Sequence, residues 1–156
     1  MIKQKLILIL ISLLLTGPLH SAGNDDTSTK EDNYLKAYNL IKSAEKLEKK
    51  NKEEASIKKY KEALKYLIIE NKDKPNQPDT LNYLGYSSRK LGDLQVAEEY
   101  YLRGLALNPL HIAINEYLGE LYVKTGRIDK AMERLKVLQN CNCEEFEELQ
   151  TLISKN

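Results

Sequence analysis

The sequence predicts an all-α protein made of about three helical hairpins and a C-terminal capping helix. From Tyr34 onward, apolar residues recur at the spacing that places them on one face of a helix. No stretch after residue 23 alternates apolar and polar residues, as a half-buried strand would. Residues 81–86 are also similar to residues 115–120, at an offset of 34 residues. Self-similarity at that period is typical of stacked helical hairpins.

The composition fits one domain with no nucleic-acid partner. The chain has 156 residues, 42% of them hydrophobic, with ten Tyr, one Phe and no Trp. An interior of Leu, Tyr and small residues is more typical of stacked helices than of a compact enzyme core. Charged residues make up 30% of the chain and the net charge is +1, so the basic surface of a nucleic-acid-binding protein is not expected.

Residues 1–23 have the order of a secretory signal peptide. Lys3 and Lys5 precede an apolar run over residues 6–15, and small residues at 21–23 offer a cleavage site. The run is shorter than the roughly 20 residues of a membrane span. We therefore expect export, to the periplasm or the exterior of a bacterial cell. The alternative is an uncleaved membrane anchor.

The predicted mature chain is close to neutral and begins with a polar segment. Without Lys3 and Lys5, 22 basic residues face 23 acidic ones, a net charge of −1. Residues 24–33 lack apolar periodicity, which predicts a disordered lead-in. We expect no membrane insertion after the signal peptide is removed. The abundance of Lys, Asn and Ile suggests a bacterial genome rich in A and T.

Helical periodicity and turn residues divide the rest of the chain. The predicted units are a degenerate hairpin over 34–70, a loop over 71–77, hairpins over 78–111 and 112–143, and a capping helix over 144–156. The first helix of the first hairpin is expected to end near Asn51, since Asn tolerates a left-handed backbone. The capping helix has apolar residues at helical spacing and would cover the last exposed apolar face.

Small residues recur at the offset of 34 residues. The recurring pairs are Gly85 and Gly119, Gly92 and Gly126, and Ala97 and Ala131. A Gly inside a helix costs about 1 kcal/mol relative to Ala. Gly85 and Gly119 are therefore expected where another helix comes very close. Gly92 and Gly126 stand where a residue of positive φ would end a helix.

Residues 78–145 resemble two tetratricopeptide repeats. The residues that carry the resemblance are Leu84-Gly85, Ala97, Tyr101, Pro109, Leu118-Gly119, Tyr122 and Ala131. Ser88, Leu138 and Cys143 depart from the repeat pattern. The chain also resembles small exported bacterial proteins of this class that end in a Cys-containing turn and an acidic helix. The resemblance implies a right-handed superhelix that binds other proteins and does no chemistry.

The resemblance further implies that the first helix of each hairpin lines a concave groove. The residues expected on its wall are Tyr38, Ile41, Glu45, Asn82, Tyr86, Arg89, Glu116, Glu120 and Lys124. Tyr and Arg suit the anchoring positions of a protein interface. The three acidic residues argue against capture of an acidic C-terminal tail. The alternative is that these side chains only form a solvated face.

These features predict an adaptor of the bacterial cell envelope that binds a peptide or helix of a partner protein. The sequence does not identify the partner, because a repeat scaffold does not specify its ligand. Self-association is also possible, since three hairpins leave exposed apolar ends.

Cys141 and Cys143 are the only two cysteines, and one residue separates them. In an oxidising compartment they can form a disulfide that stiffens the turn before the capping helix. A ring over one intervening residue is strained and easier to reduce, so the alternative function is a thiol-dependent redox helper. With only His111 left in the mature chain, a metal site is not expected. No phosphate loop, paired-His motif or nucleophile elbow is present, which predicts no enzyme and no cofactor.

Overall fold

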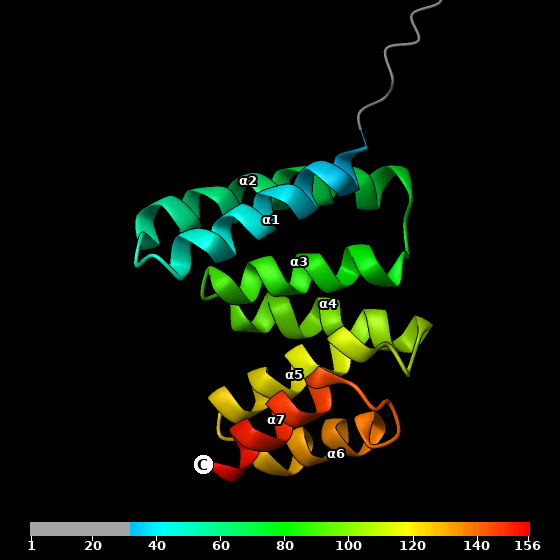
Figure 1. Cartoon of the computed structure of the whole chain (residues 1–156). Helices are drawn as coiled ribbons and strands as arrows, with labels where there is room; N and C mark the ends of the chain where they lie inside the picture. Colours follow the sequence, from blue (N-terminus) through cyan, green and yellow to red (C-terminus); the bar gives the residue numbers. More distant parts are fainter. Residues whose placement is uncertain (1–31) are drawn as a thin grey trace, which may run out of the picture. The chain divides into compact units, whose positions relative to one another are not determined.

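Seven helices follow one another along residues 32–156, the part of the chain that the computed structural model describes (Figure 1). They are α1 (Asn33–Glu48), α2 (Glu53–Asp73), α3 (Pro78–Lys90), α4 (Leu94–Leu107), α5 (Ile112–Lys124), α6 (Ile128–Leu138) and α7 (Glu144–Ser154). These residues contain no strand, and the all-α prediction is confirmed. The predicted signal peptide and residues 24–31 of the predicted lead-in lie outside the described residues.

The helices pack as three hairpins, α1 with α2, α3 with α4 and α5 with α6, stacked in chain order (Figure 1). The first helices contact one another, α1 with α3 and α3 with α5. Among the described residues the second helices α2, α4 and α6 make no such contacts. The stack therefore curves with the first helices on its inner side. The last helix, α7, packs against both α5 and α6.

The ends of the helices follow from local sequence. Asn51, Gly92 and Gly126 have φ values of 55°, 89° and 72°, and each stands in the turn between the two helices of a hairpin. All three were expected to leave the right-handed region. At the start of α1, the carboxylate of Asp32 accepts hydrogen bonds from the backbone N–H groups of Tyr34 and Leu35.

Two boundaries differ from the sequence prediction. The second helix continues to Asp73, so it includes the first three residues of the predicted loop over 71–77. Nothing in residues 71–73 breaks a helix, and the proline that follows is at position 75. The first helix begins at Asn33, the last residue of the predicted lead-in.

The core depends on close approach at the glycines inside helices. A Cβ placed on Gly85 would lie 2.5 Å from Cε1 of the Tyr101 ring, which packs from α4. At the equivalent position in the next hairpin, a Cβ on Gly119 would lie 2.5 Å from Cδ2 of Leu149. Leu149 belongs to α7, so the capping helix supplies the contact that α4 supplies one hairpin earlier. No described helix is both long and apolar enough to cross a membrane.

Candidate functional site

The residues that the sequence placed on a groove wall divide into exposed and buried ones. Five of them keep exposed surface. Tyr38, Glu45, Arg89 and Glu120 are half-buried, and Lys124 is exposed. They come from α1, α3 and α5, the first helices of the three hairpins.

Four of the predicted wall residues are buried. Ile41 is 0% exposed and belongs to the core stripe of α1 with Ala37 and Ala44, so its assignment to the groove was wrong. The spacing of these three residues, four and three apart, points them at α2 and α3 together. The other buried residues are Asn82, Tyr86 and Glu116.

Tyrosine rings contact one another in two groups on the first helices. The centroid of the Tyr83 ring in α3 lies 5.8 Å from that of Tyr34 and 5.7 Å from that of Tyr38, both in α1. Further along α3, Tyr86 lies 4.8 Å from Tyr117 of α5. Burial raises the pKa of Tyr83, Tyr86 and Tyr117, so their hydroxyl groups stay neutral.

Sequence reasoning missed three of these tyrosines as wall residues, Tyr34, Tyr83 and Tyr117. A signal was available for two of them, because Tyr83 and Tyr117 are separated by the repeat offset of 34 residues. They precede Leu84-Gly85 and Leu118-Gly119. The helical projection placed only their neighbours Asn82 and Glu116 on the wall.

Arg89 lies between two of these rings. Its guanidinium carbon is 5.4 Å from the ring centroids of both Tyr86 and Tyr117, and an Arg nitrogen is 2.6 Å from a carboxylate oxygen of Glu120. The side chain is only 14% exposed. Of the three acidic residues of the predicted wall, Glu120 holds this guanidinium.

Glu45 instead stabilises the first two hairpins. Its carboxylate accepts a hydrogen bond of 3.0 Å from the hydroxyl of Tyr86 and one of 2.8 Å from the Lys42 ammonium. Near it, Lys90 of α3 donates a 2.8 Å hydrogen bond to Glu48 of α1. Charges on this part of the inner face are therefore largely paired within the protein.

Acidic residues gather where α5 meets α7. Glu116 is 3% exposed. Burial raises its pKa to about 9, helped by a hydrogen bond with Glu148 and by the charges of Glu120, Glu148 and Glu145. Burial and the neighbouring carboxyl groups therefore favour the protonated form of Glu116. The helical projection alone gave no sign that α7 would cover this residue.

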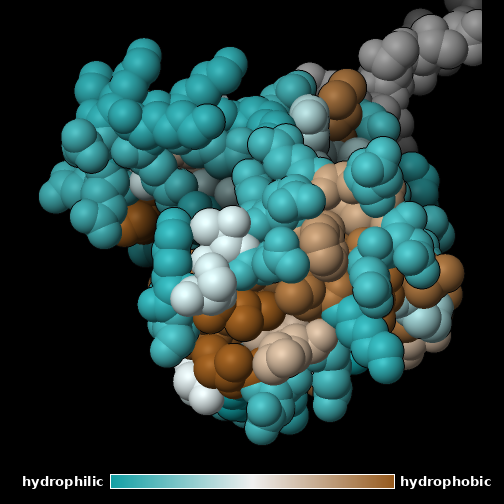
Figure 2. All heavy atoms as spheres, turned by 60° about the horizontal axis from the view of Figure 1, so that its bottom comes forward, coloured by the Kyte–Doolittle hydropathy of each residue, from teal (hydrophilic) through white to brown (hydrophobic). Residues whose placement is uncertain are grey.

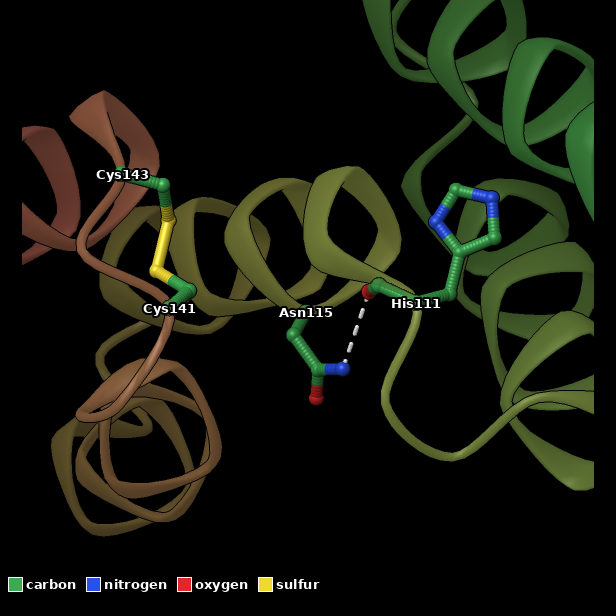
Figure 3. The surroundings of a disulfide bond; sticks show 4 residues. All are labelled: His111, Asn115, Cys141 and Cys143. Carbon is green, nitrogen blue, oxygen red and sulfur yellow. Dashed lines mark hydrogen bonds between the residues drawn. A yellow bond between two sulfur atoms is a disulfide. The ribbon is translucent and has the colours of Figure 1, made fainter.

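Cys141 and Cys143 are joined in a disulfide between α6 and α7 (Figure 3). His111 lies at the start of α5, away from this bond (Figure 3). Its Nε2 is 3.0 Å from a carboxylate oxygen of Asp79, and its Nδ1 accepts the backbone N–H of Ile114. Both ring nitrogens are thus occupied by structural contacts. Within residues 32–156, no three potential ligands gather around a possible metal position.

The α6–α7 end shows an apolar area with a hydrophilic rim (Figure 2). Met132 of α6 is 55% exposed, and Leu135, Leu152 and Ile153 are half-buried. This is the kind of end surface on which self-association was predicted. That expectation stays a prediction.

This architecture is similar to that of known proteins. Residues 89–155 match the family model described as tetratricopeptide repeat. The structure is similar to the type III secretion translocator chaperone SycD of Yersinia enterocolitica, with a TM-score of 0.54 and 20% identity over 76% of this chain and 78% of the other. The fold is that of a tetratricopeptide repeat protein.

Two further tetratricopeptide structures are similar. The first such domain of Spaghetti (RPAP3), bound to an HSP90 peptide, has a TM-score of 0.50 and 20% identity over 78% of this chain and 94% of the other. The C-terminal domain of an FK506-binding protein of Plasmodium falciparum has a TM-score of 0.50 and 22% identity over 80% and 90%. No curated protein matches the sequence. At these identities, the likeness establishes the fold alone.

Proposed function

We propose that this protein is a non-enzymatic scaffold that binds a peptide or helix of a partner protein on the inner face of α1, α3 and α5. The observation that carries the proposal is the contact of tyrosine rings between successive first helices, Tyr34 and Tyr38 with Tyr83, and Tyr86 with Tyr117. Tyr34, Tyr38 and Tyr83 are half-buried, so part of each ring remains available to a ligand. Tyrosine offers a large contact area and a hydroxyl at low entropic cost, which suits an interface anchor.

The relatives support this type of ligand. The Spaghetti domain is bound to an HSP90 peptide, and SycD is a chaperone of secretion translocators. The inner face of this chain carries acidic residues. Glu45 and Glu120 keep exposed surface there, so an acidic C-terminal tail would meet like charges. We infer that the ligand is not of that kind.

Site-specific photo-crosslinking tests the proposal. A photoreactive phenylalanine analogue would replace Tyr38 or Tyr83 on the inner face and, as the control, Leu102 on α4, which is 48% exposed. Cell extracts should give the same crosslinked partner chain from both inner positions and little from Leu102. Equal crosslinking from Leu102 would contradict binding on the inner face.

We also propose that the scaffold acts outside the cytoplasm of a bacterium. The support is the signal-peptide pattern of residues 1–23. Fractionation and N-terminal sequencing should find a mature chain that begins near residue 23 or 24. A membrane-bound form that still begins with Met1 would replace export with anchoring.

A second candidate function is that of a thiol-dependent redox helper. The disulfide favours it because Cys141 and Cys143 are both half-buried, in a turn that a second thiol could approach. Equilibration against glutathione buffers tests this function. A redox helper should exchange within the range of the glutathione pool, and a bond that stays intact throughout that range would exclude the role.

A further inference from the structure

Three half-buried tyrosines form a cluster on the inner face where α1 lies beside α3. The ring of Tyr83 meets those of Tyr34 and Tyr38 edge-on, with centroid separations of 5.8 and 5.7 Å and interplanar angles of 60° and 68°. The rings come from the first helices of two successive hairpins. Because all three residues keep exposed surface, the cluster offers aromatic surface to a ligand.

The hydroxyl groups of these tyrosines are available to a ligand. Within residues 32–156, none of the three makes a hydrogen bond, and each hydroxyl reaches the surface. Burial raises the pKa of Tyr34 to about 12 and also raises that of Tyr83, so both hydroxyls keep their protons at neutral pH. By contrast, the hydroxyl of Tyr86 already donates to Glu45. The cluster therefore presents hydrogen-bond donors beside its aromatic surface.

Charged groups near the cluster are paired within the protein. Three ion pairs with separations of 2.6 to 2.8 Å lie along the first helices. They join Lys42 to Glu45, Lys90 to Glu48, and Arg89 to Glu120. A charged group of a ligand would have to compete with one of these pairs for its partner, whereas an uncharged ligand leaves all three intact.

We propose that the cluster of Tyr34, Tyr38 and Tyr83 binds a proline-rich, extended segment of the partner protein. This inference rests on the function proposed above and adds the chemical class of the ligand. A polyproline II helix of prolines is uncharged, has no backbone N–H groups and leaves its carbonyl groups without internal hydrogen bonds. Its rings can pack on aromatic side chains while its carbonyl groups accept hydrogen bonds from the tyrosine hydroxyls.

The size of the cluster fits this ligand. One turn of a polyproline II helix has three residues and is about 9 Å long, so it is long enough to contact at least two rings whose centroids are 5.8 or 5.7 Å apart. An α-helical ligand fits less well. Its backbone carbonyl groups are already bonded within the helix, so only its side chains could accept from the tyrosine hydroxyls.

Titration of the predicted mature chain with acetyl-nonaproline amide tests the proposal. The control is an acetylated Gly-Ser peptide amide of the same length, which is also uncharged but is flexible and lacks rings. NMR of the tyrosine ring signals follows binding. Nonaproline should shift the signals of Tyr34, Tyr38 and Tyr83 and bind at least about fivefold more tightly than the control. Equal affinity of the two peptides, or shifts confined to other tyrosines, would overturn the proposal.

Variants separate the ring from the hydroxyl. Tyr83→Phe keeps the ring and removes one donor, whereas Tyr83→Leu removes both, so the affinity for nonaproline should fall about threefold in the first and at least about tenfold in the second. The matched control is Tyr100→Phe on the outer helix α4, where Tyr100 is also half-buried and its substitution should not change the affinity. Melting curves show whether each variant is folded, and unchanged affinity in both folded Tyr83 variants would contradict the proposal. If photo-crosslinking finds a partner on the inner face but nonaproline binds no more tightly than the Gly-Ser peptide, the scaffold function stands and only the ligand class is refuted.

Discussion

Arg89 of α3 and Glu120 of α5 form an ion pair of 2.6 Å that joins two successive hairpins. The guanidinium is mostly buried and lies against the rings of Tyr86 and Tyr117. Removing one partner of a poorly solvated pair leaves the other charge without compensation. Arg89 therefore has a structural role in addition to any role in binding.

A double-mutant cycle measures that role. Arg89→Ala and Glu120→Ala should each lower the free energy of unfolding by about 1–2 kcal/mol, since the pair is partly exposed. The double variant should lose less than the sum, because the two residues stabilise the fold through each other. Chemical denaturation provides the measurement. Strict additivity would mean that the pair contributes nothing beyond its separate packing contacts.

Alanine at either of two glycines should destabilise the fold, for different reasons. Gly85→Ala would place a Cβ 2.5 Å from the Tyr101 ring and should cost about 1–3 kcal/mol by overpacking. Gly92→Ala meets no atom within 4 Å but has φ of +89°, and should cost about 1–2 kcal/mol through backbone strain. Gly85→Leu and Ala97→Leu should be at least as damaging as Gly85→Ala.

Asparagine separates the two effects. It tolerates positive φ, so Gly92→Asn should melt close to the parent protein, whereas Gly85→Asn should stay destabilised. Thermal melts of the four alanine and asparagine variants provide the comparison. Equal melting temperatures for Gly85→Ala and the parent would show that α3 and α4 do not approach as described.

The buried Glu116 predicts an unusual dependence of stability on pH. Its pKa is raised from 4.5 to about 9, chiefly by burial and by Glu148. Between these values the folded protein holds a proton that the unfolded chain has released, so this group lowers stability as the pH rises. Glu116→Gln cannot ionise. It should raise the melting temperature near pH 9 and change it little near pH 5.

The control for this prediction is Glu54→Gln, an exposed substitution on α2. Melting curves between about pH 5 and pH 9 should show the parent slope in the control and a shallower slope in Glu116→Gln. Parallel slopes in all three proteins would show that Glu116 is ionised in the folded state.

The disulfide should contribute modestly to stability. It closes a ring over one intervening residue, and in the chain-entropy account so short a ring contributes about 1–2 kcal/mol. The double variant Cys141→Ser with Cys143→Ser should lose about that much in urea denaturation and keep its helical circular dichroism. Loss of helical signal would mean that docking of α7 requires the bond.

The hairpins could be located from the sequence because the residues that end a helix act on the backbone at their own position. The turn residues Asn51, Gly92 and Gly126 end helices by backbone conformation alone, and the repeat offset aligned two hairpins. The position of α7 could not be predicted in this way. Its apolar stripe shows that it covers a face, but not that Leu149 would fill the space above Gly119.

The groove residues were harder to predict because two adjacent faces of one helix both lie near the core. The sequence alone does not show which of the two faces is buried. On α1, Ile41 and Tyr38 are less than one turn apart, and contacts with α2 and α3 bury Ile41. On α4, Glu98 forms a 2.8 Å ion pair with Arg127 of the next hairpin. Such pairing between hairpins depends on their relative placement, which no single repeat encodes.

Substitution of half-buried tyrosines on the inner face should affect ligand binding, whereas substitution of a buried one should affect stability. Tyr38→Ala and Tyr83→Ala should each weaken binding of the crosslinked partner by about 1–2 kcal/mol, as expected for anchors of an interface. Tyr86→Ala should act differently. It is 6% exposed, packs against Tyr117 and donates a hydrogen bond to Glu45, so its loss should lower stability.

The controls lie on the outer helix α4, where Glu99→Ala and Leu102→Ala remove exposed side chains. Titration calorimetry with the partner, paired with a melting curve for every variant, separates affinity from folding. Tyr38→Ala and Tyr83→Ala should lower the affinity for the partner while the melting temperature changes little, because part of each ring faces solvent. The outer substitutions should change neither quantity. Affinity losses from Glu99→Ala and Leu102→Ala as large as those from Tyr38→Ala would place the ligand on the outer helices, since a single bound peptide cannot depend equally on opposite sides of the stack.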